Sequence, residues 1–516
     1  MVCCLGGGSV ALCTQILPLE RVSGWPEPPR KFSSPSKEVS TQWGTSYQVN
    51  VDPLGQNIVG DAANEPSLCI DPNNQDRIAI GWRQFNSITN SFRQAGYGWS
   101  TNGGLSWGFG GVLETNVFRS DPVLAPDADG GFYYLSLTPF PVFACDLWKS
   151  TNGGRAWTRI GPALGGDKSW MTIDATTNAT EGTVYECWSV VENQYGTNII
   201  SSSPDLGRTW HNPSPIPQLP FWSTMDLGPG GELYHFGWNG EGFWLSRSTN
   251  SLQEPGSLVF DLSTEVDLGG DLATISPINP DGLLGQPWVA IDRSAGPYRG
   301  RVYTLSSVSR NGSPVDVMFA RSLNGGQTWE PPVRLNDDTA GLKAYHWFGT
   351  LSVAPSGRVD ACWYDTRNSQ LNHTSELYYT YSLDGGTTWA TNRAVSPPFD
   401  QSLGYPSQQK IGDYIGMVSI PDAACVAYSA TFNGEEDIWF LRVDQPLVAR
   451  IAQSGRGLEL GWDAVVGRTY CIQAIPNLKT SWTNALNLGC LSATNLLMRV
   501  NLPISDRVEF FRVVRE

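Results

Sequence analysis

An eight-residue pattern that occurs five times limits what this chain can fold into more than any other feature of its sequence. The pattern is S-x-[DN]-x-G-x-x-W, and its copies begin at Ser100, Ser150, Ser203, Ser322 and Ser382. An Asp or Asn at the third position closes a turn by accepting backbone N–H groups, and Gly supplies a positive φ. The Trp covers the turn with a large apolar ring. The pattern therefore predicts a stapled hairpin with a structural role and no direct part in catalysis.

The spacing of these turns predicts a propeller of small sheets. Successive copies begin 50, 53, 119 and 60 residues apart, and the longest interval contains a degenerate copy at Ser246–Gln253. Strand–turn–strand segments such as "SLCIDPNNQDRIAIGW" and "LSVAPSGRVDACWY" occur seven times. Repeats of this length with strand-like content are typical of β-propellers. We predict an all-β propeller of seven blades, with six blades as the alternative, in which Ser46–Asp52 supplies the missing strand of the last blade.

Composition supports an all-β protein and excludes two classes of partner. The 516 residues include 55 Gly, 35 Pro and 21 Trp, and only 16% of the chain is charged, as expected for many short strands joined by tight turns. The net charge of −15 argues against nucleic acid or an anionic membrane surface as the main partner. No apolar run after the first 20 residues is long enough to span a membrane.

Three regions follow from these patterns. Residues 1–45 are expected to be a poorly ordered leader or targeting segment, 46–444 the propeller, and 445–516 a small β-sandwich. The first 20 residues are apolar but carry no Lys or Arg before Arg21, so they form an atypical signal peptide. The expected location is secreted, periplasmic or at the cell surface.

The cysteines give no sign of a metal site. The chain has ten Cys, but no CxxC pair or Cys/His cluster has the spacing of a zinc site, so we expect neither metal nor cofactor. Cys69, Cys362 and others lie within apolar runs and are expected to be buried free thiols. Cys471 and Cys490 are left as either a disulfide or two thiols.

Polar side chains gather where the propeller topology places ligand sites. In a four-stranded blade, the loop between the second and third strands and the crossover to the next blade lie on one face, which we call the loop face. Arginines, carboxylates and aromatic rings at these positions suit a polar or acidic sugar. The candidate site residues are Glu65, Arg83, Arg119, Asp121, Trp170, His346, Asp365, Arg367, Asp413 and Tyr414.

We expect the charged candidates and Tyr414, but not His346, to converge in one pocket near the propeller axis. Structural alternatives exist for several of them. Arg83 can brace a neighbouring blade, Asp365 and Arg367 can pair across a loop, and Trp170 can pack between blades.

The repeated turn resembles the Asp box of the sialidase (neuraminidase) superfamily. This resemblance implies an arginine clamp for a substrate carboxylate, a tyrosine nucleophile polarised by a glutamate, and an aspartate acid. The corresponding residues here are Arg83, Arg119 and Arg367 for the clamp, Tyr414 as nucleophile, Glu65 as its partner, and Asp121 or Asp365 as the acid. The sequence departs from the family because it has no F/Y-R-I-P motif before the first box and because sialidases have six blades.

The tail resembles another kind of module. Its segment "LELGWDAVVGRTYCIQA" is similar to small fibronectin-like sandwiches at the ends of secreted bacterial enzymes.

Three functional hypotheses remain after the sequence alone. The first is a secreted sialidase-like exo-glycosidase that acts on an acidic or polar glycan. The second is a non-catalytic propeller that binds glycan or protein, and the third is a carbohydrate lyase with Tyr414 or His346 as base. Whether the chain is an enzyme is left open, and we expect a monomer.

Overall fold

The computed structural model describes residues 24–515 and shows regular structure made only of strands in this range. The stretches not described within it are 140–141, 179, 250–257, 275, 311–312, 340–342, 446–448, 455–456, 465–467, 477–480, 482–484, 495–496 and 504–509. The degenerate turn predicted at Ser246–Gln253 therefore lies partly outside the described residues. No helix among the described residues is long and apolar enough to cross a membrane.

Seven antiparallel sheets follow one another along the described chain from residue 62 to residue 444. The first sheet contains β5 (Ala62–Asp71), β6 (Asn74–Phe85), β7 (Gln94–Ser100) and β8 (Gly108–Val112). The second contains β9 (Ser120–Pro126), β10 (Phe132–Thr138), β11 (Ala144–Ser150) and β12 (Thr158–Pro162). The third contains β13 (Trp170–Ile173), β14 (Val184–Cys187), β15 (Asn198–Ser203) and β16 (Ser214–Pro215). Each strand of these sheets pairs with the strand that precedes it in the chain, so each sheet is a simple meander.

The next three sheets repeat the meander with one addition. The fourth sheet contains β17 (Trp222–Leu227), β18 (Leu233–Trp238), β19 (Phe243–Ser248) and β20 (Leu262–Val266). The fifth contains β22 (Trp288–Ile291), β23 (Val302–Arg310), β24 (Ser313–Ser322) and β25 (Val333–Arg334), and β21 (Asp271–Leu272) also pairs with β23. The sixth contains β26 (His346–Val353), β27 (Val359–Asp365), β28 (Glu376–Ser382) and β29 (Arg393–Ala394).

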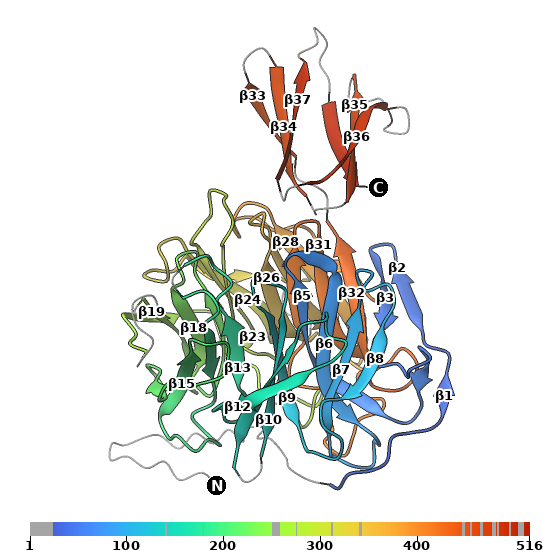
Figure 1. Cartoon of the computed structure of the whole chain (residues 1–516), viewed down its shortest axis with the longest axis vertical. Coiled ribbons are helices and arrows are strands. Elements are labelled where there is room, and N and C mark those ends of the chain that lie inside the picture. Colours follow the sequence, from blue (N-terminus) through green and yellow to red (C-terminus); the bar gives the residue numbers. More distant parts are fainter. Residues whose placement is uncertain are drawn as a thin grey trace.

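The first strands of the sheets surround a common axis. β5 contacts β9, and the contacts continue through β13, β17, β22 and β26 to β30 (Gly416–Ile420), which contacts β5 again. Figure 1 shows these sheets packed side by side in one body. The described sheets are therefore the blades of a propeller, and we number them blade 1 to blade 7 in chain order.

The N-terminal part of the described chain completes blade 7. This sheet contains β30, β31 (Ala423–Ala430) and β32 (Asp437–Asp444), and β3 (Gly44–Gln48) adds to β32 with Ser46 opposite Leu441 and Gln48 opposite Trp439. The predicted pairing of this N-terminal segment with the last blade is confirmed. A strand from each end of the propeller sequence thus shares one sheet, which leaves the ring without an open joint.

The leader boundary predicted at residue 45 is placed too late. β2 (Glu38–Thr41) pairs with β3 as the outermost strand of blade 7, and β1 (Ser33–Ser34) pairs with β4 (Asn57–Ile58). The β2 sequence EVST is short and mostly polar, so the sequence pattern did not indicate a strand there. The segment is a strand because it pairs with β3. Residues 1–23 of the predicted leader lie outside the described part of the chain.

The five repeated turns have the predicted structure. In the first, Gly104 N–H donates to Ser100 Oγ over 2.9 Å and Ser106 N–H donates to Asn102 Oδ1 over 3.0 Å. Gly104 has a φ of +90°, and a Cβ on it would lie 2.0 Å from Phe440 of the preceding blade. Glycine is therefore required both by the backbone conformation and by the close approach of the blades.

The Trp of the turn joins neighbouring blades. Trp107 packs on Phe440 of blade 7 with ring centroids 5.3 Å apart, and Trp389 of blade 6 packs on Phe319 of blade 5 at 5.0 Å. The ring of each turn is thus part of the apolar layer between two sheets. The cysteines expected to be free, Cys69, Cys145, Cys187, Cys362 and Cys425, are buried free thiols within the blades.

The tail forms two three-stranded sheets. They are β33 (Ala449–Ser454), β34 (Gly457–Asp463) and β37 (Leu497–Pro503), and β36 (Leu486–Ser492), β35 (Thr469–Ile475) and β38 (Phe510–Arg515). Cys471 and Cys490 form a disulfide between β35 and β36. Arg468 forms an ion pair with Asp76 in the first turn of blade 1, so the tail lies at the end of the propeller opposite the loop face (Figure 1).

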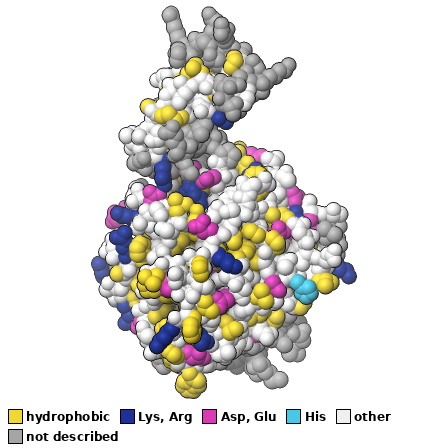
Figure 2. Space-filling model, turned by 90° about the vertical axis from the view of Figure 1, so that its right-hand side faces the viewer, with side chains coloured by type: hydrophobic (Ala, Val, Ile, Leu, Met, Phe, Trp, Pro, Cys, Tyr) yellow, Lys and Arg dark blue, Asp and Glu magenta, His cyan; other side chains and the backbone are white. Residues whose placement is uncertain are grey.

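The surface shows no single dominant charge on the face seen in Figure 2. Lys and Arg side chains lie there among Asp and Glu side chains and apolar ones.

Removal of a turn ring should loosen the propeller. Trp107 is 9% exposed, and its replacement by alanine leaves a cavity between blades 7 and 1. We expect Trp107→Ala to lower the free energy of unfolding by about 3–5 kcal/mol in urea denaturation. Leu105→Ala in the same turn is the control, because Leu105 is 59% exposed and should have little effect. Equal losses from the two variants would contradict the structural role of the ring.

Candidate functional site

Bulges at the start of the first strands aim charged side chains at the axis. The register of β5 on β6 shifts between Asn64 and Ser67, and that of β9 on β10 shifts where Asp121 and Pro122 face a single residue. Glu65 and Asp121, which stand in these bulges before prolines, have φ values of 52° and 45°. Bulges re-aim side chains, and a left-handed non-glycine backbone is strained. The "NEPS" and "RSDP" segments, which contain Glu65 and Asp121, therefore differ from regular strands in both register and backbone conformation.

Six charged side chains meet at the axis, and we call them the axial cluster: Glu65, Arg83, Asp121, Lys168, Lys410 and Asp413. They are held in a chain of ion pairs. Glu65 pairs with Arg83 at 3.3 Å and with Lys410 at 3.0 Å. Asp413 pairs with Lys410 at 2.7 Å and with Lys168 at 2.5 Å, and the Lys168 ammonium lies 3.9 Å from Asp121.

Burial and charge act against each other in this cluster. Burial alone raises the pKa of Asp413, but Lys168, Lys410 and Arg83 outweigh burial and hold its pKa below the usual range. The pKa of Glu65 is raised because burial outweighs the pull of Arg83 and Lys410. All six side chains are at most 4% exposed. The cluster therefore links blades 1, 2, 3 and 7 by buried ion pairs of balanced formal charge.

Aromatic rings close the axis beside the charges. Trp170 packs edge-on against Trp288 at 5.0 Å and against Tyr414 at 5.8 Å. Tyr414 is 3% exposed and donates its hydroxyl to the carbonyl of Pro122 over 3.1 Å. Burial, Glu65 and Asp121 raise the pKa of Tyr414 well above its usual value. Its phenol is therefore neutral and enclosed, which does not fit an accessible nucleophile, and Trp170 packs between blades.

A second group of charges surrounds His346 between blades 5 and 6. The Nε2 atom of His346 lies 3.2 Å from Asp338 and 3.6 Å from Asp365, and its Nδ1 donates to the carbonyl of Val315 over 2.7 Å. Burial lowers the pKa of His346, but Asp338 and Asp365 outweigh it and raise that pKa. Arg367 pairs with Asp365 at 2.8 Å. These contacts tie the crossover before blade 6 to the end of β27.

Arg119 belongs to a third group of charged side chains, which lies in blade 2. Its Nη2 lies 2.5 Å from Glu114 and 2.6 Å from Asp146, and its guanidinium stacks on Trp148 at 4.7 Å. Asp146 also pairs with Arg159. The Nη1 atom of Arg119 has no hydrogen-bond partner among the described residues. One end of this guanidinium is therefore fixed, while the other end retains a donor.

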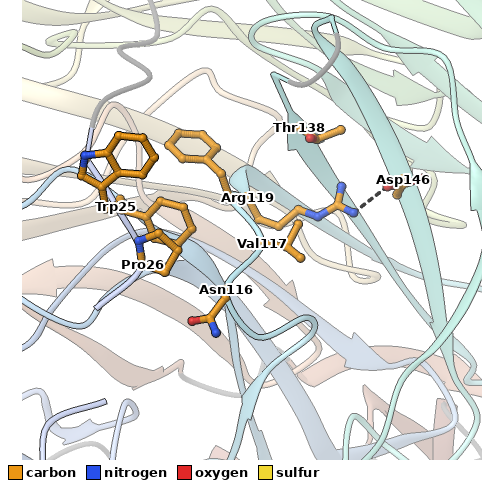
Figure 3. Close-up of a pocket in the computed structure, with 10 residues that line it drawn as sticks. Trp25, Pro26, Asn116, Val117, Arg119, Thr138 and Asp146 are labelled. Atoms are coloured by element: carbon orange, nitrogen blue, oxygen red, sulfur yellow. Dashed lines mark hydrogen bonds and ion pairs between the residues drawn. The ribbon is translucent and has the colours of Figure 1, made fainter. Parts of the chain in front are cut away.

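Arg119 also lines a cavity of about 720 Å³, which we call the Arg119 pocket. Its lining includes Trp25, Phe92, Phe118, Thr138 and Asp146. Figure 3 shows the Arg119 guanidinium reaching toward Asp146, with Trp25 on the opposite side of the pocket.

The wall that carries Trp25 is held by amide side chains of blade 1. Asn90 donates to the carbonyl of Trp25 over 2.6 Å, and Asn86 donates to the carbonyl of Glu27 over 2.6 Å. Trp25 itself is 82% exposed. The backbone of Trp25 is therefore held in place by hydrogen bonds, and the exposed Trp25 ring can contact a ligand.

The predicted convergence of the charged candidates and Tyr414 in one pocket is wrong. Glu65, Arg83, Asp121, Asp413 and Tyr414 do meet, but their side chains are buried and the charged ones are held in ion pairs. Asp365 instead lies beside His346, and Arg367 pairs with both Asp365 and Asp337. Arg119 turns toward Glu114 and Asp146. The three arginines of the proposed clamp therefore lie in three different places.

Sequence reasoning missed several residues that matter. Lys410 is central to the axial cluster, where it pairs with Asp413 and Glu65. Lysine in "QQKIGDY" gave a signal, since it stands three residues before Asp413 in a crossover. Trp25 was hidden because it lies in the segment assigned to the leader. Among the described residues, no group of three or more His, Cys, Asp and Glu side chains is placed to hold a metal ion.

The strand pairing and the ring of inner strands define the protein as a β-propeller. No family model matches the sequence. A search of curated proteins also gives no match.

Solved structures that are similar include a protein of unknown function from Dyadobacter fermentans, an ulvan lyase, and an α-L-arabinofuranosidase of Fusarium graminearum. Each is 13% identical to this chain, and the TM-scores are 0.43, 0.45 and 0.31. The alignments cover 79%, 75% and 62% of this chain and 99%, 94% and 92% of those chains.

The charge on His346 gives a pH dependence with a definite sign. A raised pKa in the fold means that the folded state holds the proton more tightly, so this stabilisation is complete below the ordinary pKa of about 6.5. It is lost as the pH rises through the pKa of the folded state. We expect the wild type to exceed His346→Gln in urea stability by most at low pH, and by progressively less toward pH 9.

A buried histidine elsewhere serves as the comparison. Burial lowers the pKa of His235 to about 3, so this ring stays neutral in the fold. The stability that depends on neutral His235 should fall as the pH drops below about 6.5, which is the opposite trend. A difference between wild type and His346→Gln that does not change with pH would contradict a charged His346.

Proposed function

We propose that this chain binds a polar glycan on the loop face, in the Arg119 pocket. The observation that carries the proposal is a cavity lined by Arg119 on one side and by the exposed Trp25 ring on the other. A sugar ring has an apolar C–H face that packs on aromatic side chains and hydroxyls that accept hydrogen bonds. The cavity volume of about 720 Å³ falls within the range of small-ligand sites.

The surroundings of the pocket favour binding over turnover. Asp146 is held by two arginines, and Glu114 is held by Arg119. A glycosidase needs two carboxyl groups with space for the sugar between them. The Arg119 guanidinium occupies the space between these carboxylates, so a glycan-binding propeller is the version of the proposal that the geometry supports best.

A sialidase-like exo-glycosidase is the second candidate, and one observation favours it. Glu65, Asp121 and Lys168 all have positive φ and all belong to the axial cluster. Strained charged residues that face one another are often functional. In this version the axial cluster opens to admit a sugar, and the protein works outside the cytoplasm as its apolar N-terminus suggests.

Binding should depend on Trp25 and Arg119. We expect Trp25→Ala and Arg119→Lys each to weaken binding to a glycan array by about tenfold or more, since each removes one wall of the site. Phe32→Ala is the matched control, because Phe32 is 77% exposed in the same N-terminal segment but does not line the pocket. Unchanged binding by both pocket variants, with the melting temperature preserved, would contradict this location.

Turnover separates the two candidates. A screen against fluorogenic glycosides, including a sialoside, should show no release of the fluorophore if the chain only binds. Release that disappears in Tyr414→Phe and persists in Trp25→Ala would instead assign the activity to the axial cluster.

A further inference from the structure

The charged side chains at the Arg119 pocket are buried within its walls. Arg119 and Asp146 line the cavity but are only 4% and 6% exposed, and they pair with each other at 2.6 Å. Arg93 packs on the Phe118 ring at 4.4 Å, is fully buried and donates to the carbonyl of Ser91 over 2.8 Å. A ligand in the cavity therefore meets little charge, although charged groups support the walls around it.

The surface that a ligand does meet is largely apolar. Trp25, Pro26 and Val117 line the cavity and are exposed, and Phe92 lines it and is partly exposed. Figure 3 shows Trp25 and Pro26 on one side of the pocket, and Val117 beside the Arg119 side chain on the other. Apolar side chains therefore border the cavity on two sides.

A polar edge accompanies these apolar walls. Asn116, which is next to Val117 in the chain, also lines the cavity and is exposed. Its backbone N–H donates to the Gln94 Oε1 atom over 2.6 Å, which holds the residue in place. Its side-chain amide offers two donors and an acceptor to a ligand. The pocket thus fits a small molecule that is apolar on two sides and carries hydroxyl groups at one edge.

We propose that the Arg119 pocket selects 6-deoxyhexoses, the sugars in which a methyl group replaces the hydroxymethyl group. The inference rests on the proposed function, which it narrows from polar glycans in general to this class. A 6-deoxyhexose keeps its ring hydroxyls and carries one apolar methyl. Its ring packs on Trp25, its methyl lies against Val117, and its ring hydroxyls face Asn116.

The two apolar walls contribute differently to this selection. A pyranose of either kind can pack a C–H face on Trp25, so this ring does not separate hexoses from deoxyhexoses. At Val117 a hydroxymethyl group would lose hydrogen bonds to water without gaining a partner, which costs free energy. A methyl group there gains apolar contact without that loss. One such contact in an apolar site discriminates by about tenfold to a hundredfold.

The test uses matched pairs of neutral trisaccharides. Two of them end in L-fucose or L-rhamnose, and their partners end in L-galactose or L-mannose, so the members of a pair differ by one oxygen atom at carbon 6. We expect the wild type to bind at least one deoxy trisaccharide about tenfold or more tightly than its partner in calorimetric titrations.

A nearly isosteric change at the second wall should reduce this preference. Val117→Thr replaces a methyl by a hydroxyl, which can pair with the 6-hydroxyl of a hexose. The variant should bind the deoxy trisaccharide more weakly and its hexose partner more tightly, so that the ratio of affinities falls to about threefold or less. Because Val117 is exposed, the melting temperature should not change.

A control variant and the outcomes complete the test. Val333→Thr makes the same exchange on β25 of blade 5, where Val333 is 40% exposed and does not line the pocket, so it should keep the wild-type ratio. Equal affinities within both pairs, a preference for the hexoses, or a ratio that Val117→Thr leaves unchanged would overturn the inference while the proposed function stands. Binding to other glycans but to none of the four trisaccharides would do the same. Absence of binding to any glycan would overturn the inference and the proposed function together.

Discussion

The pairing of β3 with β32 is the interaction on which the rest of the molecule depends. It places a strand from the N-terminal side of the propeller in the same sheet as β30, β31 and β32. Only a closed ring brings blade 7 against blade 1, and this contact places Glu65 next to Lys410 and Asp413 next to Lys168. Without closure these charges would be buried without partners, which is costly.

The molecule uses its two faces differently. The repeated turns lie at the end near the tail, where Trp107 and its counterparts join adjacent blades and the glycine at the fifth position of each turn is required by a close contact. The opposite face carries the bulges at Glu65 and Asp121, the Asp and Arg groups, and the pocket walled by Trp25. The repeated turns thus stabilise one end of the propeller. The rigid sheets hold the irregular loops at the other end in place, so that these loops can form a site.

Local patterns predicted the scaffold, whereas the site depended on distant contacts. The turn at Ser100 and the strand at Ser46 follow from spacing and residue type, because each is defined within a few residues. The direction of Arg119 does not, since Glu114 and Asp146 capture its guanidinium from a loop and a neighbouring strand. Trp25 is held at the pocket because Asn90 donates to its carbonyl and Asn86 donates to the carbonyl of Glu27. These asparagines lie 65 and 59 residues away in the chain, and no local pattern records such a contact.

A crystal structure of the chain with a bound neutral trisaccharide tests the central claim most directly. The account predicts a sugar ring against Trp25 inside the Arg119 pocket, with the ion pairs of Arg119 with Glu114 and Asp146 intact. A sugar bound at an opened axial cluster, in contact with Asp413 or Tyr414, would contradict the account and favour the glycosidase.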